Sequence, residues 1–87
     1  MIDLLAIRRY VKANAEEIYK TYKDNWIALT DSPEPHIISY DRDIRECCRK
    51  AREEVGKDFC IERVDSLAKL YGRLEIKIYN PKKVEEK

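Results

Sequence analysis

Three cysteines and a single histidine are the residues of this chain that could coordinate a transition metal. Cys47 and Cys48 are adjacent, whereas Cys60 and His36 stand apart from them. A structural zinc site usually carries ligand pairs about two to four residues apart, and adjacent residues on a helix point about 100° apart. We therefore expect no metal and no other cofactor. The thiols are expected to be reduced and to pack as small apolar side chains; a disulfide between Cys60 and one of the other two is the alternative.

Acid–base or nucleophilic catalysis would need groups that the sequence does not bring together. His36 follows a proline-rich turn and has no evident nucleophile paired with it. The aspartates stand mostly at the ends of predicted elements, where helix capping and turn formation explain them. With 2 glycines in the chain, a glycine-rich phosphate cradle cannot be built. We therefore predict that the protein is not an enzyme.

Arginines recur at three- and four-residue steps in one segment: Arg42, Arg45, Arg49 and Arg52. On a helix these side chains would form a ridge suited to phosphate groups or to an acidic protein partner. Glu46, Glu53 and Glu54 lie among them and neutralise the ridge locally. The interpretation that we favour for this surface is therefore a solvated helix face.

Two amphipathic helices are expected to position these groups. In the segment Asp3–Lys23 apolar residues recur at spacings of three and four. The segment Asp41–Gly56 has the same spacing, and its apolar stripe is Ile44, Cys47, Cys48, Ala51 and Val55. Asp41 is the expected N-cap of this second helix, and Gly56 is its expected terminating glycine.

Strand-forming residues gather in four further segments: Trp26–Thr30, His36–Tyr40, Asp58–Val64 and Arg73–Tyr79. The last segment has the cleanest alternation, with Leu74, Ile76 and Ile78 facing the core. Trp26–Thr30 is apolar on both faces, as expected of a central strand. Residues 65–71 fit either one helical turn or a loop.

The predicted order is α-β-β-α-β-(turn)-β, which is typical of an α+β domain. We expect both helices to pack on one face of a mixed or antiparallel sheet of three or four strands. A chain of 87 residues supports one core. We assign residues 1–80 to this single domain and expect a flexible tail over residues 81–87.

Composition restricts the class of partner. Lys and Arg total 18 against 17 for Asp and Glu, which leaves a net charge of +1. This balance disfavours a dedicated nucleic-acid-binding domain, which is usually strongly basic. No stretch approaches the roughly 18 apolar residues that span a bilayer, and the first residues lack the pattern of a secretory signal. We expect a cytoplasmic protein with no membrane partner.

The run Tyr22-Lys23-Asp24-Asn25-Trp26-Ile27-Ala28 resembles the opening of a small uncharacterised prokaryotic family, with its tyrosine, turn and Trp-Val-Ala-type strand. The family's later elements correspond here to Ile37–Ser39, Asp43–Glu54 and Phe59–Val64. Asp24 stands where the family pattern favours glycine. Because the family has no assigned activity, the resemblance implies an order of elements and no particular function.

The sheet face opposite the helices is the contact surface that the sequence predicts. It would collect aromatic residues with arginine, which are enriched at protein interfaces. The residues that we expect to contact a partner are Trp26, Tyr40, Arg45, Arg49, Arg52, Arg73 and Tyr79.

We expect a small non-catalytic module that binds or occludes a protein partner, as inhibitors, antitoxins and phage-encoded blockers of host defence do. The final predicted strand could also pair with a second copy of the chain to form a homodimer. The alternative is a nucleic-acid-binding regulator that uses the arginine ridge or stacks bases on the aromatic face.

Overall fold

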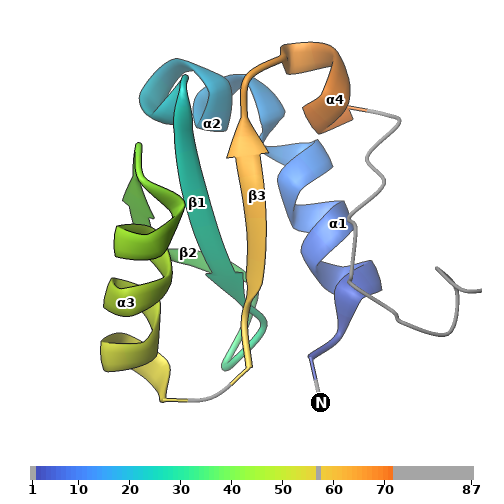
Figure 1. The fold of residues 1–87 in the computed structure, drawn as a ribbon. Coiled ribbons are helices and arrows are strands. Elements are labelled where there is room, and N and C mark those ends of the chain that lie inside the picture. The colour runs from blue at the N-terminus through green and yellow to red at the C-terminus, as the bar shows by residue number, and fades with distance from the viewer. Residues whose placement is uncertain (1, 57, 72–87) are drawn as a thin grey trace, which may run out of the picture.

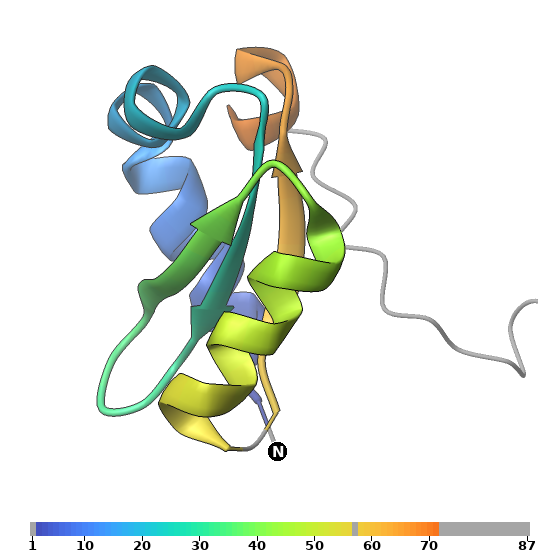
Figure 2. The same ribbon diagram turned by 60° about the vertical axis from the view of Figure 1, so that its left-hand side comes forward.

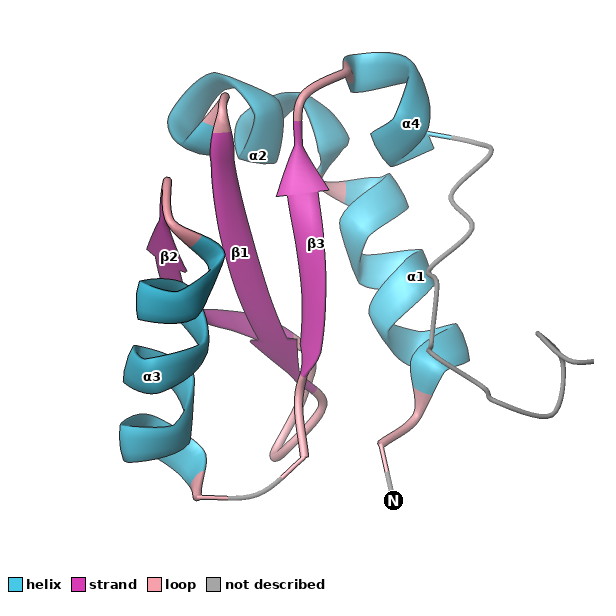
Figure 3. Cartoon of the chain, in the orientation of Figure 1, coloured by secondary structure: helices cyan, strands magenta, loops and turns pink. Residues whose placement is uncertain are grey.

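The computed structural model describes residues 2–56 and 58–71, which form four helices and a sheet of three strands (Figure 1). In chain order the elements are α1 (Leu4–Ala13), α2 (Ala15–Tyr22), β1 (Asn25–Thr30), β2 (His36–Asp41), α3 (Ile44–Val55), β3 (Cys60–Val64) and α4 (Leu67–Tyr71). Figure 3 shows the same elements coloured by type. The α+β class is therefore confirmed. The strand predicted at Arg73–Tyr79, with its contact residues Arg73 and Tyr79, and the tail 81–87 lie outside the described residues.

The sheet has the order β2-β1-β3, and both neighbouring pairs are antiparallel. Ile27 in the central strand lies opposite Tyr40 on β2 and Glu62 on β3, and the register of β1 with β2 shifts between Ala28 and Leu29. Directly opposed residues project to the same face of a sheet. Tyr40 and Glu62 therefore share a face with Ile27, whereas Trp26 projects to the other face.

The helices cover both faces of the sheet, so the prediction that they share one face is wrong. Figure 2 shows α3 in front of the sheet, with α1 and α2 behind it. On the α1, α2 and α4 side, Ile27 and Leu29 of β1 join the buried cluster. On the α3 side, Ala28 packs with Cys47 and Ala51. The physical reason is that β1 is apolar on both faces, and both faces need a cover.

The first predicted helix is divided at Asn14 into α1 and α2. Asn14 has φ −115° and ψ 22°, outside helical values. Its side-chain amide donates a 2.9 Å hydrogen bond to the Tyr10 carbonyl, and Ile18 N–H donates to the Asn14 carbonyl at 2.9 Å. Asn14 therefore ends one helix and begins the next. Both halves keep their apolar side toward the sheet, because Val11 and Ile18 belong to the same buried cluster.

The ends of α3 are set by local residues. The N-cap is Asp43, whose carboxylate accepts a 2.9 Å bond from Arg45 N–H. The predicted cap, Asp41, instead accepts a 2.9 Å bond from Asp43 N–H, because β2 continues to Asp41. Gly56 ends the helix with φ 63° and donates its N–H to the Arg52 carbonyl at 2.8 Å. A left-handed glycine at this position is common at helix ends.

Two further local features bear on the sequence analysis. Residues 67–71 form a short helix, α4, and Leu70 within it is fully buried. Asp24 has φ 69°, a conformation that favours glycine. Of the helices in residues 2–56 and 58–71, none is long and apolar enough to cross a membrane.

Candidate functional site

A groove of about 660 Å³ follows β2, which is an edge strand of the described sheet. Residues 37–40 of β2 line it together with Tyr22 from α2 and Lys50, Glu53 and Glu54 from α3. The groove thus has a strand at its base and a helix on each side. A smaller hollow of about 280 Å³ shares Tyr22 and Ile37 with it. The two hollows together follow β2 from His36 to Tyr40.

Two tyrosines form the aromatic part of the groove. The ring centroids of Tyr22 and Tyr40 lie 5.0 Å apart with the planes tilted by 60°. Tilted pairs at this distance are favourable because the edge of one ring meets the face of the other. Tyr40 is 52% exposed. The pair is therefore a preformed surface on which a ligand side chain can lie.

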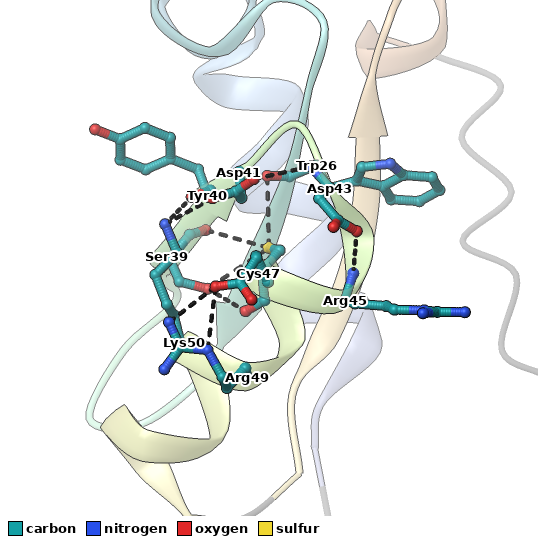
Figure 4. A network of polar contacts seen from close by, with 10 residues as sticks. Trp26, Ser39, Tyr40, Asp41, Asp43, Arg45, Cys47, Arg49 and Lys50 are labelled. Atoms are coloured by element: carbon teal, nitrogen blue, oxygen red, sulfur yellow. Dashed lines mark hydrogen bonds and ion pairs between the residues drawn. The ribbon is translucent and has the colours of Figure 1, made fainter.

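Lys50 places a cation at the Tyr40 end of the groove (Figure 4). Its Nζ donates a 2.8 Å hydrogen bond to the Tyr40 carbonyl and pairs with Asp41 Oδ2 at 3.1 Å. The same ammonium lies 5.5 Å from the centroid of the Tyr40 ring. The Asp43 backbone N–H and the Lys50 ammonium together hold the pKa of Asp41 below its ordinary value.

A buried hydrogen-bond network holds α3, and so one wall of the groove, against the sheet (Figure 4). The Ser39 hydroxyl donates to the Cys47 carbonyl at 2.8 Å. The Cys47 thiol donates to the Trp26 carbonyl at 3.5 Å. Burial raises the pKa of the Cys47 thiol, so it remains protonated at neutral pH and acts as a donor.

The acidic side chains of the groove differ in how far they are paired. Glu53 accepts a 2.8 Å bond from Arg49. Glu54 on α3 and Glu17 of the adjoining hollow are exposed, and among the described residues neither has a hydrogen-bond or ion-pair partner. Among the described residues, Lys50 is the one lysine or arginine that lines either hollow, and its ammonium is paired with Asp41. The groove therefore presents unneutralised negative charge.

The predicted contact residues do not form one surface. Tyr40 lies in the groove, whereas Trp26 projects to the other face and is half-buried beside α3. The guanidinium of Arg63 lies 5.7 Å from the Trp26 ring. Figure 4 shows Arg45 extending on the Trp26 side of α3, away from Tyr40.

The arginine ridge lies on the exposed surface of α3, and its contact with a partner stays a prediction. Arg49 is exposed and bonds both Glu46, at 2.9 Å, and Glu53. Arg52 is also exposed. Neither lines the groove.

Apart from Tyr40, none of the residues that line the groove was among the predicted contact residues: Tyr22, Ile37, Ile38, Ser39, Lys50, Glu53 and Glu54. The signal that could have found them is the position of β2 at the edge of the sheet. In this structure α2 and α3 flank that strand, and the groove lies between them. Comparisons of the chain with protein-family models, with curated proteins and with solved structures find no match.

Proposed function

We propose that this protein is a small non-catalytic interaction module that binds a protein partner by accepting an extended segment along β2. The observation that carries the proposal is the groove of about 660 Å³ at the edge strand, which is lined by the half-buried Tyr22 and the exposed Tyr40 as a contacting pair. Extended peptides commonly bind proteins by adding a strand to a sheet edge, where main-chain hydrogen bonds give affinity and side-chain pockets give specificity.

The contact between Lys50 and Tyr40 supports strand addition. The Tyr40 carbonyl accepts the Lys50 ammonium at 2.8 Å, so we infer that this carbonyl faces the open edge. In an antiparallel strand the N–H and C=O of one residue point to the same neighbour. Tyr40 would then offer both groups to an incoming segment, which would take over the carbonyl from Lys50.

Occupation of the groove would suit a blocking role. A segment held between α2 and α3 is withdrawn from its own protein's other contacts, as in an inhibitor or antitoxin. The near-neutral net charge of +1 agrees with a protein partner better than with nucleic acid.

The test is selection of a displayed random-heptapeptide library on the purified protein. We expect selected peptides to shift the backbone amide signals of Ile38 and Tyr40 in NMR titrations. Tyr40→Ala should weaken binding at least about tenfold, as for an aromatic hot spot. Leu5→Ala is the matched control, because Leu5 is 57% exposed and lies outside the groove. Peptides that bind without perturbing β2, or equally well to both variants, would refute the proposal.

A second candidate function, nucleic-acid binding, is favoured by the Trp26–Arg63 stack with Arg45 on the same side of α3. Indole and guanidinium planes are surfaces on which single-stranded bases stack. Titration with mixed-sequence oligonucleotides across a salt series tests it. Binding that weakens with salt and is lost in Trp26→Ala would support this function, whereas no binding at low salt would exclude it.

A further inference from the structure

We infer that the segment that fills the groove is cationic, with lysine or arginine side chains that pair with Glu54 and Glu17. This inference rests on the proposed function and specifies the chemistry of the partner.

The charges on the two walls favour a cation over an anion. Glu53 and Glu54 stand on the α3 side, and Glu17 stands on the α2 side. Lys50 offsets one of them, but its ammonium is already engaged by Asp41 and by the Tyr40 carbonyl. An acidic segment would meet net repulsion here, whereas a basic one would find two exposed carboxylates without partners among the described residues.

The tyrosine pair strengthens the preference for a cation. A cation near the face of a tyrosine ring is attracted by the ring's quadrupole. The structure already shows such an arrangement, because the Lys50 ammonium lies 5.5 Å from the Tyr40 centroid. An arginine or lysine stem lying on Tyr22 would also cover the half-buried Ile37 with its methylene groups while its charge remains in water.

Strand geometry adds a constraint on spacing. Successive side chains of an added strand point to opposite faces of the sheet. A side chain that reaches Glu17 must point toward α2, and one that reaches Glu54 must point toward α3. The two cationic residues should therefore be an odd number of positions apart, for example adjacent. Segments with both cations on the same face would satisfy one carboxylate only.

The experiment uses the peptides selected in the heptapeptide library on the full chain. We expect lysine and arginine to be enriched over aspartate and glutamate. Replacing one basic residue of the tightest peptide by glutamine should raise its Kd about three- to thirtyfold, the range given by one exposed ion pair and one cation–π contact. Glu54→Gln should weaken the original peptide about two- to fivefold, and the glutamine peptide should lose this sensitivity. Asp58→Asn is the matched control, since it removes one exposed negative charge outside the groove.

The outcomes separate this inference from the proposed function. Peptides that shift the amides of β2 but show no excess of basic residues, or that bind Glu54→Gln and wild type equally, overturn the inference and leave the strand-addition proposal standing. If no selected peptide contacts β2, the proposed function fails and the inference falls with it. A loss of affinity in Asp58→Asn as large as in Glu54→Gln would show a long-range charge effect and would also overturn the inference.

Discussion

Glu62 is a half-buried carboxyl group on β3, and its replacement by glutamine is a sharp test of the fold. The residue lies opposite the fully buried Ile27 and so projects toward the face covered by α1, α2 and α4. Burial raises the pKa of Glu62 from 4.5 to about 7, with a further upward contribution from Asp65 and an opposing one from Lys69. The structure thus favours the protonated side chain.

The sign of the pH dependence follows from this shift. Because the folded-state pKa of Glu62 lies above the unfolded value, the folded chain holds the proton more tightly between pH 4.5 and about 7. The stability that the protonated Glu62 side chain contributes is complete below pH 4.5 and is lost as the pH rises through 7. At 1.36 kcal/mol per pKa unit the loss is at most about 3 kcal/mol. That is a large fraction of the roughly 5–10 kcal/mol that stabilises a domain of this size.

Urea unfolding followed by circular dichroism at pH 5 and at pH 8 measures the effect. Glu62→Gln keeps the shape of the side chain but cannot ionise. We expect the variant and the wild type to have similar free energies of unfolding at pH 5, and the variant to be about 2–3 kcal/mol more stable at pH 8. Glu34→Gln, in the exposed turn between β1 and β2, should show no such change. A difference between Glu62→Gln and wild type that is the same at both pH values would show that the Glu62 carboxyl is not buried in the folded protein.

Three further predictions concern the ends of α3 and the thiols. Gly56→Ala should lower the free energy of unfolding by about 1 kcal/mol, because φ is 63° there and an alanine Cβ is strained in the left-handed region; an unchanged urea midpoint would contradict this. Asp43→Ala should cost about 1 kcal/mol through loss of the N-cap bond to Arg45, and a hydrogen-exchange experiment should show the loss as faster exchange in the first turn of α3; unaltered exchange there would count against the cap. A thiol reagent should modify Cys48 before Cys47 and Cys60, because the latter two are buried and burial raises the pKa of Cys60 to about 11; simultaneous modification of all three in the folded protein would refute that order.

Much of the secondary structure was predictable because periodic patterns dominate the chain. The two strands of the hairpin were predicted within one residue of their observed ends, Asn25–Thr30 and His36–Asp41. The break at Asn14 was not predicted, because both helices keep the same apolar spacing across it. The local cause is the Asn14 side chain, whose amide competes for the Tyr10 carbonyl.

The placement of α3 could not be read from helix periodicity alone. An apolar stripe shows that a helix must be covered, but it does not show which face of the sheet covers it. The relevant clue was in β1, where Ala28 and Leu29 are both fully or almost fully buried on opposite faces. A strand of that kind demands a cover on each side.

The candidate site was predicted only in part, because the pairing register of β1 with β2 decides which side chains share a face of the sheet. Trp26 and Tyr40 were expected to share a face, but Trp26 lies opposite Asp41 and Tyr40 lies opposite Ile27. A change of one residue in register moves every side chain to the other face, and the turn between the strands determines that register. Tyr40 therefore joins Tyr22 of α2 and Lys50 of α3, the helices on the two sides of the groove.

The small side chains beneath α3 also determine how wide the groove along β2 is. Ala28 and Ala51 are fully buried between the helix and the strands, so α3 rests close to the sheet. A bulkier residue at either position would lift the helix and carry Lys50 and its neighbouring glutamates outward, at a cost of about 1–3 kcal/mol. The size of two methyl groups inside the protein thus sets the width of the groove outside it, and chains with valine at these positions should have a wider groove along the same strand.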